Sequence, residues 1–182
     1  MQFATLFAFV SAFAASALAN SVTFVSQDGT GRTIIFTPSA GYQGIGDVHV
    51  SGRDRVRVDF PNGWIGNWYA VSDGASRIPG MLGEVTFQGW NGLTYFDVSA
   101  IVNPGDHNGV KQLYPVGSSS PKSGCTNFPC DEAYYHPDDV QTKVTSEVDL
   151  VCTLGGSGGA KRGLDEVDEK GNLPRRFVQG GM

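Results

Sequence analysis

The chain has 182 residues and a net charge of −5, and 40% of its residues are hydrophobic. The negative charge lies in residues 20–160, which carry 8 Lys or Arg against 14 Asp or Glu. Phosphate backbones repel an acidic surface, so this composition disfavours sequence-independent nucleic-acid binding. Short runs rich in Thr, Val and aromatic residues, with little helical periodicity, predict one all-β domain.

The first 19 residues are predicted to be a signal peptide. An apolar stretch from Phe3 to Phe13 precedes Ala17-Leu18-Ala19, the small-x-small pattern that signal peptidase cleaves. The stretch is too short to span a membrane, and no later segment of the sequence qualifies. We therefore expect a secreted, extracellular protein without a membrane partner, whose folded domain covers residues 20–154.

Several short β-prone runs follow the signal peptide. Ser21 to Val25 and Thr33 to Phe36 flank a glycine-rich turn, which predicts a hairpin. Residues 53–60 alternate between apolar and charged side chains, as expected for a strand with one buried and one wet face. The arginines of this run are interleaved with aspartates, so we interpret them as solvated charges rather than as a phosphate-binding stripe.

Residues 64–71 form the next expected strand and hold three large aromatic side chains, Trp64, Trp68 and Tyr69. We expect these side chains in the core, where each would bury a large apolar area. A platform on which sugar rings stack is the alternative interpretation.

The clearest hairpin signal lies between Glu84 and Val98. Two β-prone runs flank residues 89–92, where Asn91-Gly92 tolerates positive φ. If all four residues form the loop, Glu84 pairs directly with Asp97, whereas a two-residue turn at Asn91-Gly92 places them diagonally. The strand period of two keeps both on one sheet face in either case. Like charges this close are destabilising unless a cation, a proton or a ligand offsets them, so the pair is a candidate site. An ordinary solvated face is the alternative.

The second half contains three cysteines, Cys125, Cys130 and Cys152. In an oxidising compartment at most two of them pair within the chain, and Cys130 could pair with Cys125 or with Cys152. No second Cys-x-x-Cys or His-x-x-x-His pair completes a zinc site, so we expect no bound metal or other cofactor.

The composition changes at residue 155, where a Gly-rich linker begins. We expect residues 155–182 to be a disordered tail. Its dibasic pairs Lys161-Arg162 and Arg175-Arg176 are candidate cleavage sites for an endoprotease of the secretory pathway.

Four segments of the chain resemble, in order, motifs of the thaumatin-like proteins; they are residues 77–84, 95–99, 102–115 and 130–152. The chain also looks like small secreted fungal proteins that often carry a deoxyribonuclease label. The resemblance implies an antiparallel β-sandwich with an acidic cleft, to which Arg77, Glu84 and Asp97 correspond by position, with Asp106 as a further member. Thaumatin-like proteins usually hold ten or sixteen cysteines, so three imply a minimal form whose stability rests on core packing.

Two hypotheses for function use this acidic cleft. In the first, a monomeric protein binds a polysaccharide such as cell-wall β-glucan through Arg77, Glu84, Tyr95, Asp97 and Asp106. In the second, a glycoside hydrolase of the endo-β-1,3-glucanase type uses Glu84 and Asp97 as its acid/base pair. A nearby Arg77 would lower the pKa of both carboxyls and hold them ionised, which favours binding over turnover.

A third hypothesis is a metal-dependent nuclease. Asp106-His107-Asn108 and His136-Pro137-Asp138-Asp139 offer residue types that could hold Mg²⁺ and act as a general base. Adjacent side chains diverge, however, and the domain is acidic. We therefore interpret these residues as loop-forming and expect no nucleic-acid partner.

Overall fold

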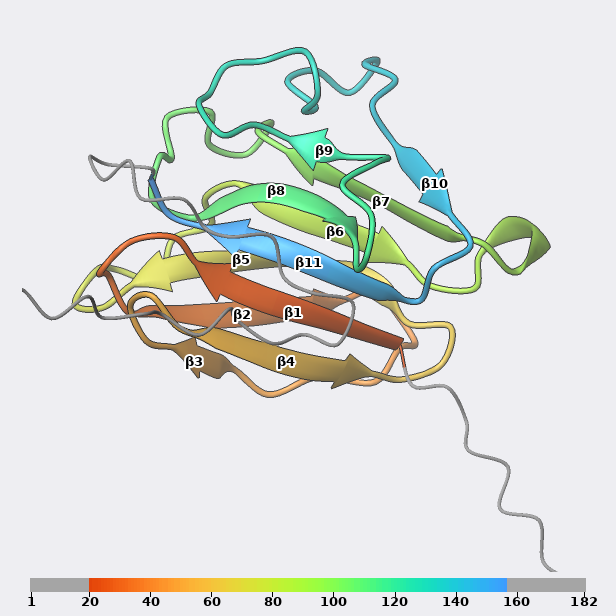
Figure 1. Ribbon diagram of the computed structural model, residues 1–182, viewed down its shortest axis with the longest axis horizontal. Coiled ribbons are helices and arrows are strands. Elements are labelled where there is room, and N and C mark those ends of the chain that lie inside the picture. Colours follow the sequence, from red (N-terminus) through yellow and green to blue (C-terminus); the bar gives the residue numbers. More distant parts are fainter. Residues whose placement is uncertain (1–19, 157–182) are drawn as a thin grey trace, which may run out of the picture.

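The computed structural model describes residues 20–156 and folds them into two β-sheets packed face to face (Figure 1). One sheet has five strands in the order β4-β1-β11-β8-β9, and the other has six in the order β10-β7-β6-β5-β2-β3. The five-stranded sheet contains β1 (Asn20–Ser26), β4 (Arg55–Phe60), β8 (Val110–Pro115), β9 (Ser123–Gly124) and β11 (Asp149–Leu154). The six-stranded sheet contains β2 (Arg32–Pro38), β3 (Val48–Val50), β5 (Ile65–Ser72), β6 (Leu82–Thr86), β7 (Thr94–Ser99) and β10 (Lys143–Thr145).

The predicted all-β sandwich is confirmed. All strand pairs in the described residues are antiparallel except β1 with β11, which is parallel. The only helical element of residues 20–156 is the 3₁₀ turn η1 (Trp90–Gly92). Within this range no helix is long and apolar enough to cross a membrane.

The core lies between the sheets and is rich in aromatic rings. Phe24 of β1 packs edge-on against Phe36 of β2 and Trp68 of β5, with ring centroids 5.9 and 5.6 Å apart. Trp64 and Trp68 are fully buried, so the expected core role of both tryptophans is confirmed. Burying each such side chain stabilises the fold by roughly 1.5–3 kcal/mol.

The predicted hairpin of β1 and β2 is wrong, because the two strands belong to different sheets. β1 pairs with β4 and β11, whereas β2 pairs with β3 and β5. Both strands carry apolar side chains that must be buried, and they bury them against each other across the interior. The glycine-rich turn between them therefore crosses from one layer to the other.

The hairpin of β6 and β7 is confirmed, with the longer of the two expected loops. Glu84 pairs with Asp97 and Thr86 with Tyr95, and the Gly89 N–H donates to the Leu93 carbonyl at 2.8 Å. Asn91 and Gly92 have φ of 58° and 72°, the left-handed conformation that the turn residues predicted.

The last two strands in chain order, β10 and β11, lie in opposite sheets. Cys125 pairs with Cys130, and Cys152 of β11 is a buried free thiol, which settles the disulfide that the sequence left open. The predicted signal peptide and nearly all of the predicted tail lie outside the described residues.

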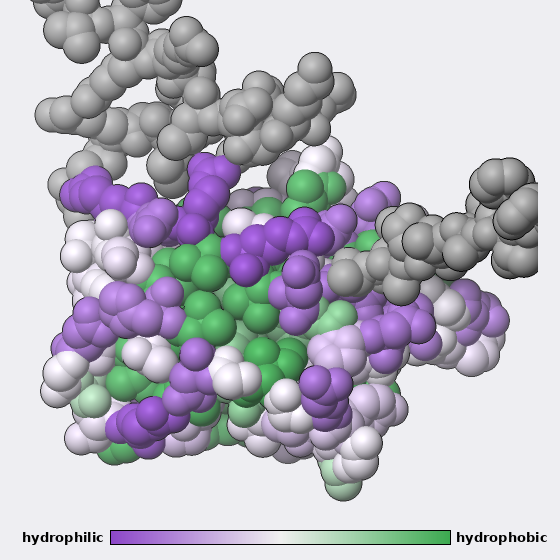
Figure 2. Space-filling model, turned by 90° about the horizontal axis from the view of Figure 1, so that it is seen from below, coloured by the Kyte–Doolittle hydropathy of each residue, from purple (hydrophilic) through white to green (hydrophobic). Residues whose placement is uncertain are grey.

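The two long sides of the sandwich differ. The segment 116–142, which contains β9, runs over one side, whereas β3 and β4 border the other (Figure 1). Apolar surface is visible between the sheets on this second side, framed by hydrophilic residues (Figure 2). We call it the open side. Val48 of β3 and Val56 of β4 lie on the edge strands that border it and are partly buried, and Tyr42 and Ile45 lie in the connection that leads into β3.

Candidate functional site

A row of polar side chains crosses the outer face of the six-stranded sheet. Asp97 of β7 pairs with Glu84 of β6, Glu84 with Asn67 of β5, and Asn67 with Thr37 of β2. Each of these residues has a buried core residue beside it in its strand. Successive side chains of a strand point to opposite faces, so all four polar side chains point outward. Thr142, beside β10, extends the row through its hydroxyl, which donates to Asp97 Oδ2 at 3.3 Å. We call these five residues the polar row.

The carboxyl of Asp97 has an unusual environment. Burial raises its pKa, and the adjacent charge of Glu84 raises it further, to about 7, although the Thr142 hydroxyl opposes the shift. Its Oδ1 atom is buried and has no hydrogen-bond partner among residues 20–156. Two opposed carboxylates repel, so the pair favours a state that retains one proton near neutral pH.

The segment after the disulfide supports this arrangement. Tyr134 joins the edge of β7, where its N–H donates to the Val98 carbonyl and its carbonyl accepts from the Ala100 N–H. Its phenol oxygen lies 2.8 Å from Thr142 Oγ1 and accepts from the Thr142 N–H. Tyr134 therefore holds Thr142 against Asp97, and no local sequence pattern signals this long-range contact.

Aromatic side chains flank the polar row on both sides. Tyr95 lies two residues before Asp97 on β7, and its hydroxyl donates to the Trp90 carbonyl at 3.3 Å. Trp90, at the hairpin tip, is 75% exposed. Tyr69 is half-buried and lies two residues after Asn67 on the outer face of β5. Of the three aromatics in residues 64–71, Tyr69 alone faces outward.

The expectation that Arg77 neutralises the carboxylate pair is wrong. Arg77 is exposed and forms its ion pair with Asp47, in the loop before β3. Because β5 and β2 separate β3 from β6 in the sheet, this ion pair holds Arg77 toward the opposite edge of the sheet from the carboxylate pair. No Lys or Arg forms an ion pair with Glu84 or Asp97 within the described part of the chain.

Asp106 lies outside the polar row and organises a loop. Its carboxylate accepts from the backbone N–H groups of Met81, Asn108 and Gly109 at 2.9–3.1 Å. The loop and the end of β5 line a hollow of about 280 Å³. Asp139 likewise accepts from the N–H groups of Tyr135 and His136. Both carboxylates act as turn formers, and residues 20–156 contain no group of three or more His, Cys, Asp or Glu side chains placed to hold a metal ion.

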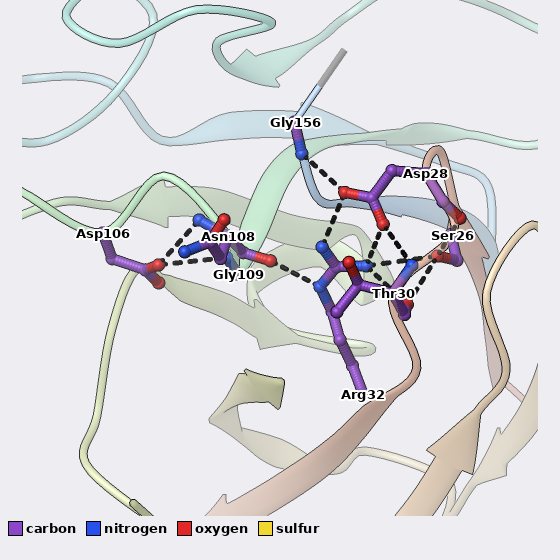
Figure 3. Close-up of polar contacts among 8 residues, drawn as sticks. All are labelled: Ser26, Asp28, Thr30, Arg32, Asp106, Asn108, Gly109 and Gly156. Atoms are coloured by element: carbon purple, nitrogen blue, oxygen red, sulfur yellow. Dashed lines mark hydrogen bonds and ion pairs between the residues drawn. The ribbon is translucent and has the colours of Figure 1, made fainter. Parts of the chain in front are cut away.

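A buried ion pair holds the same loop from the other side (Figure 3). Arg32 is fully buried, donates to both carboxylate oxygens of Asp28 at 2.9 and 2.7 Å, and donates to the Asn108 carbonyl at 2.5 Å. Burial alone would raise the pKa of Asp28, but hydrogen bonds from Arg32 and from the Thr30 N–H lower it to about 2. The Gly156 N–H donates to the same carboxylate, so the Asp28–Arg32 pair links the turn after β1 to the Asn108 loop and to the segment after β11.

Sequence reasoning missed this ion pair, because a single arginine at the start of a β-prone run usually lies on the wet face. The only local signal is the spacing of Asp28 and Arg32 across a glycine-rich turn. The network fixes the end of the sandwich and does not contact the polar row.

Comparison with known proteins gives a relative in sequence and solved structures of similar fold. No family model matches the sequence, so the likeness to thaumatin-like proteins stays a resemblance. The chain is similar to the antigenic protein SchS21 of Stachybotrys chartarum, at 58% identity over 140 residues that cover 76% of this chain and 97% of that protein. Its fold is similar to the crystal structure of the protein elicitor MoHrip2 from Magnaporthe oryzae, with a TM-score of 0.55. That match covers 75% of this chain and 98% of the other at 14% identity, and it shows the fold alone.

Proposed function

The chain belongs to the family of the fungal antigenic protein SchS21, and from this premise we propose that it is a secreted protein that binds a polysaccharide such as cell-wall β-glucan. An antigen is a protein that another organism encounters, which is consistent with action outside the cell. The predicted signal peptide supports the same location.

The polar row is the observation that carries this proposal. Strands lie about 4.8 Å apart, so five aligned side chains extend over about 19 Å, which is long enough for several sugar rings. Carboxylate, amide and hydroxyl groups bind sugar hydroxyls, and Tyr95, Trp90 and Tyr69 offer ring faces on which a pyranose can stack. A polar line flanked by aromatic side chains suits an elongated, uncharged and hydroxyl-rich ligand.

The protonation state of the carboxylate pair also suits hydroxyl groups. A sugar hydroxyl donates one hydrogen bond and accepts others. When the pair retains one proton, Asp97 can donate while Glu84 accepts, so adjacent groups offer both functions.

Co-sedimentation of the full-length secreted protein with insoluble β-1,3-glucan tests this proposal. We expect wild-type protein to sediment with the glucan, and the double variant Glu84→Gln, Asp97→Asn to bind at least tenfold more weakly, because the loss of even one hydrogen bond to a charged group costs about 1.5–3 kcal/mol. The double variant Glu147→Gln, Asp138→Asn removes two exposed carboxylates elsewhere and should bind like wild type. Wild-type protein that stays in the supernatant would contradict the proposal.

One observation favours a second candidate, a retaining glycoside hydrolase. Directly opposed strand residues have Cβ atoms about 4.5–5.5 Å apart, and retaining enzymes hold their carboxyls about 5–5.5 Å apart. Asp97, whose pKa is raised to about 7, would be the general acid, and Glu84 the nucleophile. Arg77 does not lie beside the pair, so it does not lower the pKa of the two carboxyls, which was the expected argument against turnover. Release of reducing sugar by wild type but not by Asp97→Asn would establish this activity, and equal release by both would exclude this pair as its source.

A further inference from the structure

β4 is an edge strand that borders the open side of the sandwich. It pairs with β1 on one flank and with no strand of the described chain on the other. Arg57 and Asp59 point outward from it and are exposed, whereas Val58 and Phe60 point into the core. The backbone groups of its free flank can therefore accept a further strand.

The charges of β4 are complementary to those of a second, antiparallel β4. Pairing centred on Val58 places Arg57 of each copy opposite Asp59 of the other copy, so the contact forms twice about a two-fold axis. On the inner face the same register places Val56 opposite Phe60. We propose that this protein forms a symmetric dimer through antiparallel pairing of β4 from two copies, which joins the two five-stranded sheets into one.

The apolar surface of the open side adds to this interface. Figure 2 shows apolar surface between the sheets on this side. Val48 and Val56 lie on the two edge strands β3 and β4, Tyr42 and Ile45 lie in the connection that leads into β3, and all four side chains are incompletely covered. When two β4 strands pair, the open sides of both copies face each other and these side chains leave water together. Removing apolar area from water stabilises association by about 25 cal/mol per Å² before the entropic cost of binding.

The ion pairs that Arg57 forms within its own chain do not prevent the pairing of two β4 strands. Arg57 contacts Asp59 at 3.2 Å and Asp149 at 3.0 Å in its own chain, and its side chain is 52% exposed. Exposed pairs of this kind contribute little, so Arg57 can exchange its Asp59 partner for that of the second copy at small cost. The dimer departs from the monomer expected from the sequence, which does not reveal that β4 is an edge strand.

Sedimentation velocity on the full chain, over a concentration series at low and high salt, tests the dimer. We expect the wild-type weight-average mass to rise toward that of two copies, and less steeply in high salt, which screens exposed pairs. Arg57→Asp replaces the two attractions between Arg57 and Asp59 of opposite copies by repulsions between aspartates, and it should weaken association by about tenfold or more. The exchanged variant Arg57→Asp, Asp59→Arg restores opposite charges and should recover it.

A matched control lies on the same strand and face. Arg55→Asp makes the same change in net charge. In the proposed register Arg55 faces Pro61 of the second copy, beyond the end of the ladder, so the Arg55→Asp variant should associate nearly as wild type does. Thermal unfolding checks that every variant is folded. A wild-type chain that stays monomeric at all concentrations would overturn the proposal, as would equal association of wild type, Arg57→Asp and the exchanged variant. Either result would mean that the charges of β4 serve to keep this edge strand from pairing with other chains.

Discussion

At the scale of single residues, Asp97 links the candidate site to stability. Its pKa of about 7 in the folded protein lies above the ordinary value of 3.8, so the folded state holds a proton that the unfolded chain releases between these values. Stability must therefore fall as pH rises from about 4 to about 7 and then level off. Asp97→Asn, which stays neutral, should lack this fall and be more stable than wild type at about pH 8. Because the carboxyl keeps some contact with solvent, we expect a gain on the order of 2 kcal/mol.

Urea unfolding at about pH 5 and pH 8 measures this effect. Asp138→Asn is the matched control, since it removes an exposed carboxylate in a loop and should leave the pH profile of wild type unchanged. Parallel profiles for wild type and Asp97→Asn would show that Asp97 titrates normally. The proposed donor role of Asp97 toward sugar hydroxyls would then fail as well.

At the scale of elements, the position of β6 depends on a glycine beside the core. Gly83 pairs with Trp68, and a Cβ atom at Gly83 would lie 2.6 Å from the buried indole ring. Gly83→Ala should displace Trp68 or β6 and cost about 1 to 3 kcal/mol of unfolding free energy. Because Glu84 is the next residue, the same shift should weaken glucan binding.

Gly92→Ala is the control for this prediction. Gly92 has positive φ but open space around its added Cβ, so the change should cost only the backbone strain, about 1 kcal/mol, and leave Glu84 in place. Unfolding midpoints and glucan co-sedimentation of the two variants separate the effects. Equal loss of binding in both would show that the position of β6 does not govern the site.

The same elements show what the sequence could predict. The β6–β7 hairpin and the shared sheet face of Glu84 and Asp97 follow from turn residues and period two, which are local signals, whereas the direct pairing of the two residues was one of two registers that these signals left open. Three other features depend on contacts between distant segments, which no local pattern encodes. They are the sheet that β1 joins, the ion-pair partner of Arg77, and the position of Thr142, which Tyr134 holds against Asp97. The buried Arg32 was missed for the same reason, because its burial depends on the loop around Asn108.

At the scale of the whole molecule, stability rests on the core rather than on cross-links. The single disulfide joins Cys125 and Cys130, which are five residues apart, and lies in the segment that covers one side of the sandwich. The buried aromatic and aliphatic side chains between the sheets do not depend on it. A short closed loop restricts the unfolded chain only modestly, so the bond should contribute about 2 kcal/mol.

The double variant Cys125→Ser, Cys130→Ser should therefore fold, with an unfolding free energy about 2 kcal/mol below that of wild type in urea titrations. Its remaining thiol, Cys152, is fully buried, and burial raises its pKa to about 12. A thiol reagent should therefore label neither native wild type nor the native double variant, and should label one thiol per chain in either protein after unfolding without reductant. Failure of the double variant to fold would mean that the disulfide segment, rather than the core, holds the two sheets together. Loss of glucan binding by a folded variant would instead show that this segment has ceased to hold Thr142 against Asp97.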